Sequence, residues 1–240
     1  MSGQLTRNEQ RTARNRLIRT HYFALKRRYG PQHWWPGRTR LEVIIGAFLT
    51  QNTSWKNVER AIANLRRSRA LNLTALRALP EQEVAMLIRS SGYFRQKARR
   101  IKNFISYLDR DHGGNIPRLF QSRTASEIEE LRQQLLALNG IGPETADAIL
   151  LYAGKYPVFV VDAYAKRLLA RHQVFPETTP YDIIRLSVEA AFPSGQRTEH
   201  LNEFHALIVQ VGKNHCHKSN PDCASCPLRR FLPVNPGPRK

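Results

Sequence analysis

The sequence contains little cysteine and no long apolar run, and both absences narrow the classes of protein to consider. Its three cysteines, among 240 residues, are crowded near the C-terminus. An odd number of cysteines in one short segment does not match the disulfide framework of a small secreted protein. No stretch of about 18 or more apolar residues is present, which argues against a membrane-spanning helix. The first twenty residues also lack an apolar signal core, so we expect a cytoplasmic protein.

Acidic residues are scarce as well. The chain has 19 acidic residues against 38 basic ones, which gives a formal net charge of +19. Such an excess points to a polyanionic partner such as nucleic acid. The alternative is a basic protein whose charge only keeps it in solution. Apolar residues make up 41% of the chain, enough for a core, and the length allows one large domain or two small ones that share a groove.

Helical periodicity dominates the chain. Apolar residues at positions i, i+3, i+4, i+7 and i+8 form the stripe of a buried helix face in segment 41–49. Pro80 suits a first helical turn, and Thr124 with Glu127 forms a capping box. Only the short run 157–161 could be a strand, so the sequence predicts an all-α fold. Further apolar stripes predict helices at 58–65, 84–88, 98–108, 128–138 and 204–211.

Three segments read as irregular. HGGNIP (112–117) and FPETTP (175–180) carry the glycine, proline and polar residues of loops. The C-terminal segment 232–240 is rich in proline and basic residues, which predicts a disordered tail.

The most informative stretch runs from Leu138 to His172. A helix end is followed by Gly140 and Gly142, which permit a tight turn and a close backbone approach to a ligand. Pro143 then opens a new helix, so free backbone N–H groups would point outward as a binding site for a DNA phosphate. A Gly-x-Gly pair alone is a weak signal, and a plain connection between helices remains the alternative.

A carboxylate follows a buried apolar run at Asp162. It stands between Val161 and a helix that carries Leu168 and Leu169. Aspartate is a good N-cap, so a purely structural role is the alternative to a functional one. Both roles can coexist, because a cap holds the side chain rigidly.

These motifs together resemble the endonuclease III superfamily of DNA glycosylases. Its helix-hairpin-helix, Gly/Pro-rich loop and aspartate signature matches LNGIGPETA and VVDAY. The resemblance covers roughly residues 25 to 230, through LEVIIGAFLTQNTSW, SGYFRQKARRI and the cysteines. Within the superfamily, the chain is most similar to bacterial 3-methyladenine DNA glycosylases of the endonuclease III type, in WWP (34–36), LTQNT, SGYFRQKA and GPETADAILLYA.

The resemblance implies a DNA groove between two helical subdomains of a protein that we expect to be a monomer. One is a central barrel, 40–145, that ends in the hairpin; the other combines 1–39 with 146–240 and holds a cysteine loop at 216–232. It further implies that Gln51 probes the gap left by a flipped base, although a polar helix-end residue is the alternative. The residues expected to contact DNA are Gln51, Gly140, Ile141, Gly142 and Thr145.

The resemblance also implies Asp162 as the catalytic residue. A glycosylase removes the base from the stack, and its sugar then passes through an oxocarbenium-like state that a carboxylate stabilises. Bifunctional relatives add a hairpin lysine, which forms a Schiff base. Glu144 stands at that position and has no amine, so water is the expected nucleophile. Lys155 or Lys166 would replace the lysine only if the fold places it in the pocket.

Aromatic residues suggest a base pocket. Trp34 and Trp35, followed by Pro36, would form a flat wall on which a cationic alkylated base can stack. A buried aromatic corner is the alternative. Trp55 is expected in the core, and the basic run 96–100 is expected to contact the DNA backbone or to be solvated.

The cysteines Cys216, Cys223 and Cys226 have the spacing C-x6-C-x2-C, which suits a metal or iron–sulfur loop. The family's loop has a fourth cysteine, and that position is Leu232 here. Three outcomes stay open. The loop holds a [4Fe–4S] cluster with one unusual ligand, or a zinc ion with His215 or His217, or no metal at all.

The favoured function is hydrolysis of the N-glycosidic bond of a damaged base, an alkylated purine such as 3-methyladenine, by a monofunctional enzyme. Its partner would be double-stranded DNA containing that base, within the nucleoid. An endonuclease III-like glycosylase/AP lyase for oxidised pyrimidines is an alternative, against which Glu144 speaks. A non-catalytic DNA-binding module is another, against which Asp162 and Gln51 speak.

Overall fold

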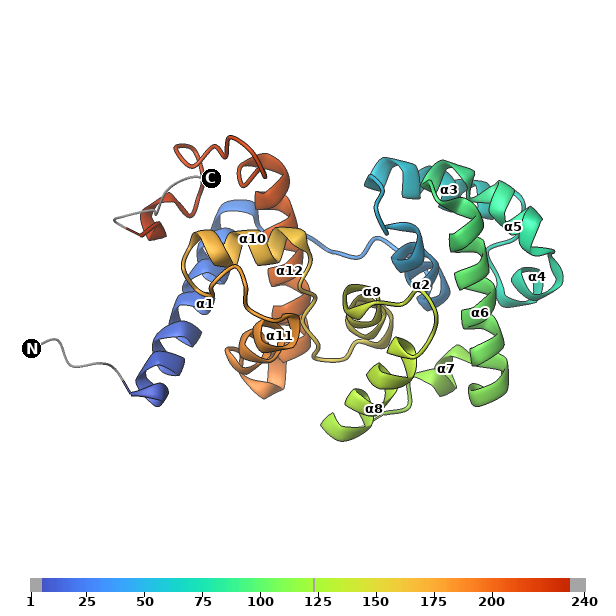
Figure 1. Ribbon diagram of the computed structural model, residues 1–240, viewed down its shortest axis with the longest axis horizontal. Helices are drawn as coiled ribbons and strands as arrows, with labels where there is room; N and C mark the ends of the chain where they lie inside the picture. The colour runs from blue at the N-terminus through green and yellow to red at the C-terminus, as the bar shows by residue number, and fades with distance from the viewer. Residues whose placement is uncertain (1–5, 123, 234–240) are drawn as a thin grey trace, which may run out of the picture. The chain divides into compact units, whose positions relative to one another are not determined.

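The regular structure is entirely helical, which confirms the all-α prediction. The computed structural model describes residues 6–122 and 124–233. In that part of the chain, no segment pairs as a strand (Figure 1). No helix among these residues is long and apolar enough to cross a membrane. Most of the predicted disordered tail, residues 234–240, lies outside the described residues.

The chain divides into two compact units. The central unit comprises Trp35–Tyr156, and the N/C unit joins Met1–Trp34 to Pro157–Lys240. The subdomain boundaries expected from the motifs, 39/40 and 145/146, stay a prediction.

The central unit is built around one almost wholly buried helix. The apolar stripe predicted for 41–49 forms α2, which contacts α3, α6 and η2. Pro80 caps α5, and Thr124 forms the expected capping box with Glu127 at the start of α8. The elements of this unit are α2 (Arg40–Leu49), α3 (Trp55–Arg67), α4 (Leu73–Ala78), α5 (Glu81–Leu87), η1 (Arg89–Ser91), α6 (Phe94–His112), α7 (Ile116–Leu119), α8 (Ala125–Leu136), α9 (Pro143–Ala148) and the π-helical η2 (Ile149–Gly154).

The N/C unit packs α12 against α1, α10 and α11 (Figure 1). Its first helix was not predicted, because its sequence is polar with only a narrow buried face that includes Ile18 and Leu25. The capping box of Thr6 and Glu9 was the available signal. The elements are α1 (Arg7–Tyr29), α10 (Ala163–Arg171), α11 (Tyr181–Ala190), η3 (Ser194–Gln196), α12 (Arg197–Asn214) and η4 (Arg229–Phe231).

Two local expectations need correction. The segment 112–117 is not wholly a loop, because Asn115 caps a one-turn helix that begins at Ile116. The run 96–100 is not a uniformly exposed basic face, because Lys97 is buried. Its Nζ donates to the carbonyl oxygens of Leu49 (2.9 Å) and Ser91 (2.6 Å) and so ties the end of α2 to α6. Burial lowers the pKa of Lys97 to about 8.

Candidate active site and cysteine loop

Asp162 is the N-cap of α10 and is held in place by the helix that it opens. Its Oδ1 accepts a hydrogen bond of 2.7 Å from the Ala165 N–H. The side chain is 13% exposed, so the carboxylate is sheltered but reachable. The capping role and a chemical role are therefore compatible, since only one oxygen is used by the cap.

The second carboxylate oxygen of Asp162 faces His205. Oδ2 lies 3.6 Å from His205 Nε2, a separation at which a protonated imidazole forms an ion pair. His205 is buried on α12. Sequence reasoning missed it, because the stripe of α12 predicts burial there but not a neighbour far away along the chain.

The start of α10 is positioned by a close approach to α12. A methyl group on Gly212 would lie 2.1 Å from Cδ1 of Tyr164, so only glycine leaves room for that ring. Tyr164 stands two residues after Asp162, and the contact therefore fixes the orientation of the cap.

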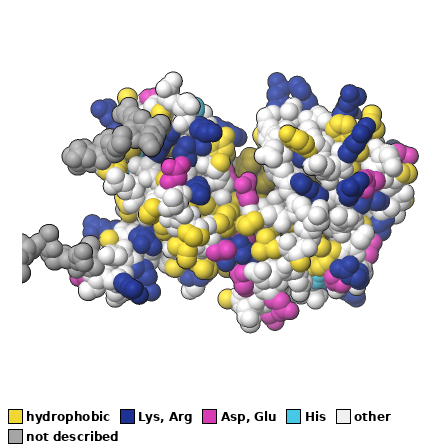
Figure 2. Space-filling view, in the orientation of Figure 1, with side chains coloured by type: hydrophobic (Ala, Val, Ile, Leu, Met, Phe, Trp, Pro, Cys, Tyr) yellow, Lys and Arg dark blue, Asp and Glu magenta, His cyan; other side chains and the backbone are white. Residues whose placement is uncertain are grey.

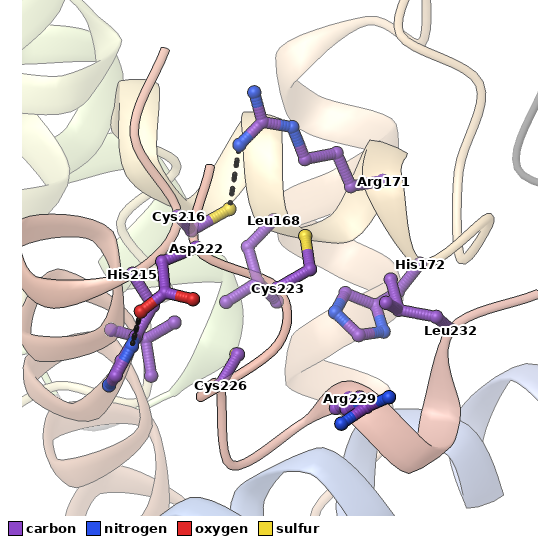
Figure 3. A pocket seen from close by; sticks show the side chains of 11 residues that line it. Leu168, Arg171, His172, His215, Cys216, Asp222, Cys223, Cys226, Arg229 and Leu232 are labelled. Carbon is purple, nitrogen blue, oxygen red and sulfur yellow. Dashed lines mark hydrogen bonds and ion pairs between the residues drawn. The ribbon is translucent and has the colours of Figure 1, made fainter. Parts of the chain in front are cut away.

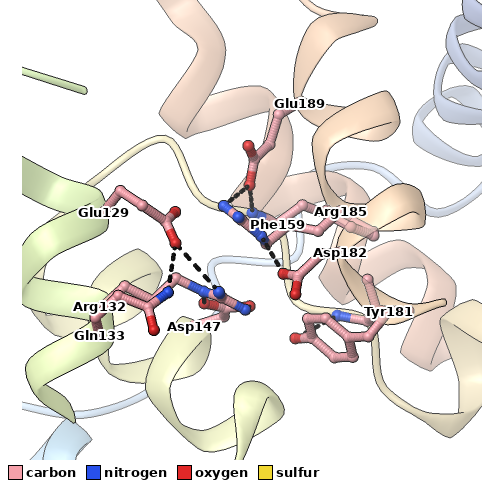
Figure 4. Close-up of polar contacts among 10 residues, drawn as sticks. Glu129, Arg132, Gln133, Asp147, Phe159, Tyr181, Asp182, Arg185 and Glu189 are labelled. Carbon is pink, nitrogen blue, oxygen red and sulfur yellow. Dashed lines mark hydrogen bonds and ion pairs between the residues drawn. The ribbon is translucent and has the colours of Figure 1, made fainter. Parts of the chain in front are cut away.

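The apolar run before Asp162 has no regular secondary structure and is held by side chains rather than by a sheet. The Phe159 N–H donates to Glu189 Oε1 (2.9 Å), and the Val161 N–H donates to the Tyr181 hydroxyl (3.2 Å). Glu189 also pairs with Arg185, as Figure 4 shows. The side chains of α11 thus satisfy donors that a neighbouring strand would otherwise bind.

In the central unit, α8 and α9 form the two helices of the predicted hairpin. Arg132 of α8 donates to both carboxylate oxygens of Asp147 on α9, over 2.6 and 3.2 Å. Glu129 adds a longer contact to Arg132 and accepts from Gln133 (Figure 4). The two helices are therefore locked by charge as well as by apolar packing.

The two glycines of the hairpin, Gly140 and Gly142, differ in backbone conformation and in the space around the Cβ position. Gly140 has φ +84°, and a methyl group on it would lie 2.1 Å from Nε of Arg100, so the turn itself requires glycine. Gly142 has φ −93° and no atom within 4 Å of where its Cβ would lie. It caps α9 without a side-chain hydrogen bond and is exposed. The fold leaves open space at Gly142, while Ile141 and Thr145 are buried.

Gln51 is bound to this hairpin. Its Nε2 donates to the Gly140 carbonyl (3.0 Å) and to Oγ1 of Thr145 (2.9 Å). Its Oε1 accepts from Arg100. Gln51 therefore braces the turn, so probing the gap of a flipped base would require it to give up these bonds.

The two tryptophans of the expected base pocket belong to different units, and each is half-buried. Nζ of Lys213 lies 6.0 Å from the centre of the Trp34 ring. Trp35 packs edge-on against Trp55, with ring centres 5.2 Å apart. The rings of Trp35 and Trp55 both line a pocket of about 250 Å³ within the central unit. The expectation that Trp55 lies in the core is therefore wrong, because its side chain borders this pocket.

The lysine position of bifunctional relatives holds Glu144, which is exposed in the first turn of α9. Lys166 is exposed on α10, and Lys155 ends η2 with φ +60°. The Lys166 backbone N–H donates to the Asp162 carbonyl oxygen (2.9 Å), one helical turn further along the chain.

The three cysteines line one small pocket of the N/C unit (Figure 3). All three thiols are free; Cys216 is buried, and Cys223 and Cys226 are half-buried. Arg171 of α10 donates to Sγ of Cys216 over 3.2 Å. Burial, above all, raises the pKa of the Cys226 thiol, so a metal would have to displace its proton.

The pocket is lined by three thiols, two imidazoles and one carboxylate that could serve as metal donors. Leu232 also lines the pocket and offers no donor atom, as the sequence indicated. His172 lines the pocket too, although sequence reasoning did not select it. Among the residues that the structure describes, no three His, Cys, Asp or Glu side chains are grouped so that they can hold one metal ion. The pocket therefore provides one thiol fewer than the four that usually hold an iron–sulfur cluster.

Comparison with known proteins agrees with these motifs. Residues 45–193 match the HhH-GPD superfamily of base excision DNA repair proteins. A candidate DNA repair glycosylase of Methanocaldococcus jannaschii is 43% identical over 203 residues, which cover 85% of this chain and 90% of that protein. Endonuclease III of Thermotoga maritima is 29% identical, over 78% of this chain and 79% of that protein.

Solved structures share the fold. The 3-methyladenine DNA glycosylase of H. pylori, bound to 1,N6-ethenoadenine, has a TM-score of 0.70 and 26% identity, covering 83% of this chain and 97% of that one. Endonuclease III trapped covalently on DNA has a TM-score of 0.75 and 21% identity, covering 95% and 96%. The chain therefore belongs to the HhH-GPD superfamily of base excision DNA repair proteins and is an endonuclease III-like DNA glycosylase.

Proposed function

We propose that this glycosylase is monofunctional and hydrolyses the N-glycosidic bond of an alkylated purine such as 3-methyladenine. The observation that carries the proposal is the sheltered carboxylate of Asp162, with one oxygen held by the Ala165 N–H and the other facing His205. A fixed negative charge stabilises the positive charge that develops on the sugar, without having to reorganise during the reaction.

Asp162 has a second task in this scheme. Because Oδ2 is not used by the helix cap, it can accept a proton from the attacking water. His205 acts as a positioning residue that orients this oxygen across 3.6 Å. The base leaves with the electron pair of the N-glycosidic bond, and the water oxygen bonds to the anomeric carbon of the sugar.

Monofunctionality is supported by the residue at the position of the family's lysine. Glu144 has no amine and cannot form a Schiff base with the sugar, so it offers no covalent route to strand cleavage. The abasic product strand is then expected to stay intact.

Binding to double-stranded DNA is supported by the charge and by Gly142. Lys and Arg side chains outnumber acidic ones on the face drawn in Figure 2, in keeping with the net charge of +19. The free space above Gly142 suits a phosphate that approaches the backbone N–H groups of the hairpin. Affinity should fall steeply with salt, because phosphate contacts release counterions.

The preference for an alkylated purine is supported by the 3-methyladenine glycosylase relative and by Trp34. Trp34 offers an indole ring, the aromatic surface on which a cation is held best. A base alkylated at a ring nitrogen is cationic and gains from the same interaction.

We also propose that Cys216, Cys223 and Cys226 hold a [4Fe–4S] cluster, which would serve as a structural and electron-transfer group. Arg171 and Arg229 beside the pocket would balance the charge of the thiolates.

One panel of substrates tests the proposal. Duplexes that each carry a single lesion (3-methyladenine, 1,N6-ethenoadenine, an oxidised pyrimidine) are incubated with the protein and analysed with and without hot alkali. We expect breaks only at alkylated purines and only after alkali. Breaks without alkali, or a preference for oxidised pyrimidines, would favour the glycosylase/lyase instead.

A further inference from the structure

We propose that Nε2 of His172 is the fourth ligand of the iron–sulfur cluster and takes the place that Leu232 cannot fill. The inference rests on the cluster proposed above for the cysteine loop. It assigns a ligand to a histidine that lies outside the loop, at the end of α10.

His172 shares the pocket of the three cysteines. Its ring points from the end of α10 toward the loop in Figure 3, beside Leu232 and Cys223. The side chain is buried, so its ring is fixed by its surroundings rather than by solvent. A ligand in this pocket therefore meets an imidazole on the side where the loop provides no fourth thiol.

The hydrogen bonding of His172 prepares Nε2 to bind a metal. Nδ1 lies 3.3 Å from the carbonyl oxygen of Phe231, which can only accept, so Nδ1 carries the proton. The lone pair is then on Nε2, and no hydrogen bond to Nε2 is found within the described part of the chain. Histidine ligands of metals commonly donate their other ring N–H to a backbone carbonyl in this way.

A second histidine fixes the ring of His172. His21 of α1 packs edge to face against it, with ring centres 4.6 Å apart, and Phe231 packs on His21. His21 does not line the cysteine pocket and is itself fully buried. It therefore serves as a wall behind His172 rather than as a ligand.

The other donors near the loop are engaged elsewhere. His215 is 3.0 Å from the Ser225 hydroxyl and faces Asp222, as the dashed line in Figure 3 shows. Asp222 accepts from the backbone N–H and the hydroxyl of Ser225. These contacts form their own network, which leaves His172 as the donor available to the pocket.

The chemistry of a cluster agrees with this set of ligands. A [4Fe–4S] cluster needs four protein donors, one for each iron, at the corners of a cube. Cysteine thiolates can supply three, and the neutral imidazole of His172 would supply the fourth. Replacing an anionic thiolate by a neutral imidazole raises the reduction potential of an iron–sulfur centre.

The test uses the full chain, reconstituted anaerobically with iron and sulfide, and does not depend on excision activity. Iron content is measured, and the reduced cluster is studied by pulsed EPR with ¹⁵N-labelled histidine. We expect about four iron atoms per chain and a strongly coupled histidine nitrogen. His172→Ala should lose that coupling and drop to about three iron atoms on mild oxidation, whereas the matched His215→Ala should keep both.

Two further variants keep the inference falsifiable should His172→Ala fold poorly. His172→Cys should retain four irons, lose the nitrogen coupling and lower the reduction potential, and His172→Ala/Leu232→Cys should regain a stable cluster. A four-iron cluster without histidine coupling, or with coupling that survives in His172→Cys, would overturn the ligand while the cluster stands. Wild-type protein that binds no iron would overturn both, and the lesion panel would still decide the glycosylase proposal separately.

Discussion

Arg132 and Asp147 form a buried two-point ion pair that joins the two helices of the hairpin. The arginine side chain is 2% exposed and the aspartate 0%, and their shortest contact is 2.6 Å. Two parallel N–H···O bonds fix the angle between the helices more narrowly than apolar packing alone. The turn between Arg132 and Asp147, which includes Gly142, is thereby presented as a rigid unit.

Breaking this pair should destabilise the protein strongly. Asp147→Ala removes the buried carboxylate that pairs with Arg132 and keeps only the longer contact to Glu129, and we expect a loss of about 3–5 kcal/mol in the free energy of unfolding, measured with urea. Asp111→Ala, which removes an exposed partner of Arg110, should cost less than about 1 kcal/mol. Equal losses for the two variants would show that the buried pair contributes no more than a surface pair.

Lys97 should make stability depend on pH in the alkaline range. Its pKa is about 8 in the folded chain, against 10.5 for a lysine side chain in water. Between these values the unfolded chain binds a proton that the folded chain does not, so the free energy of unfolding rises with pH, by up to about 1.4 kcal/mol per pH unit. Below about pH 8 both states are protonated and this dependence disappears.

Lys97→Met isolates this effect, since it keeps the length of the side chain without a titrating group. The variant loses the bonds to Leu49 and Ser91 and should be less stable at every pH. The difference between wild type and variant should widen from about pH 7 to about pH 9.5. Parallel stability curves would contradict the shifted pKa.

Gly212→Ala should impair excision from a distance. The added methyl group meets the Tyr164 ring at 2.1 Å and must displace it, at a cost of about 1–3 kcal/mol, together with the cap at Asp162. Gly195→Ala is the control, because nothing lies within 4 Å of its Cβ position. Single-turnover rates on an alkylated duplex should fall for Gly212→Ala alone. If the two variants retain the same rate, the contact with Tyr164 does not position the carboxylate.

Trp34→Ala should weaken excision of alkylated bases more than binding to undamaged DNA. Its ring is the proposed stacking surface, and stacking of a base on an aromatic side chain is worth about 1–3 kcal/mol. Rates on alkylated duplexes and affinities for undamaged duplexes are compared in one buffer. Unchanged excision by a folded variant would leave Trp34 as a packing residue.

Much of the fold follows from local pattern. The stripe of α2 and the capping box at Thr124 could be predicted, because each depends on residues within a few turns of one another. The helix α1 could not, because its polar sequence carries almost no periodicity and its burial comes from helices far along the chain.

Candidate site residues can be selected from the sequence where they belong to a contiguous motif, but not where they meet only through distant segments. Asp162 lies inside a readable signature, whereas His205 and His172 become relevant only through contacts with distant segments. Lys97 was misread for the same reason. Its basic neighbours in the sequence suggested an exposed side chain, but its ammonium group donates to carbonyl oxygens at the end of α2 and in η1.

The most direct test of the central claim is the single-turnover excision rate of Asp162→Asn on a duplex that contains 3-methyladenine. The amide can still accept from the Ala165 N–H, so fold and DNA affinity should be kept. Loss of the negative charge should lower the rate at least about a hundredfold, while the surface control Asp111→Asn should leave it unchanged. A rate for Asp162→Asn equal to that of wild type would contradict the account, and the hairpin would then remain as an argument for DNA binding alone.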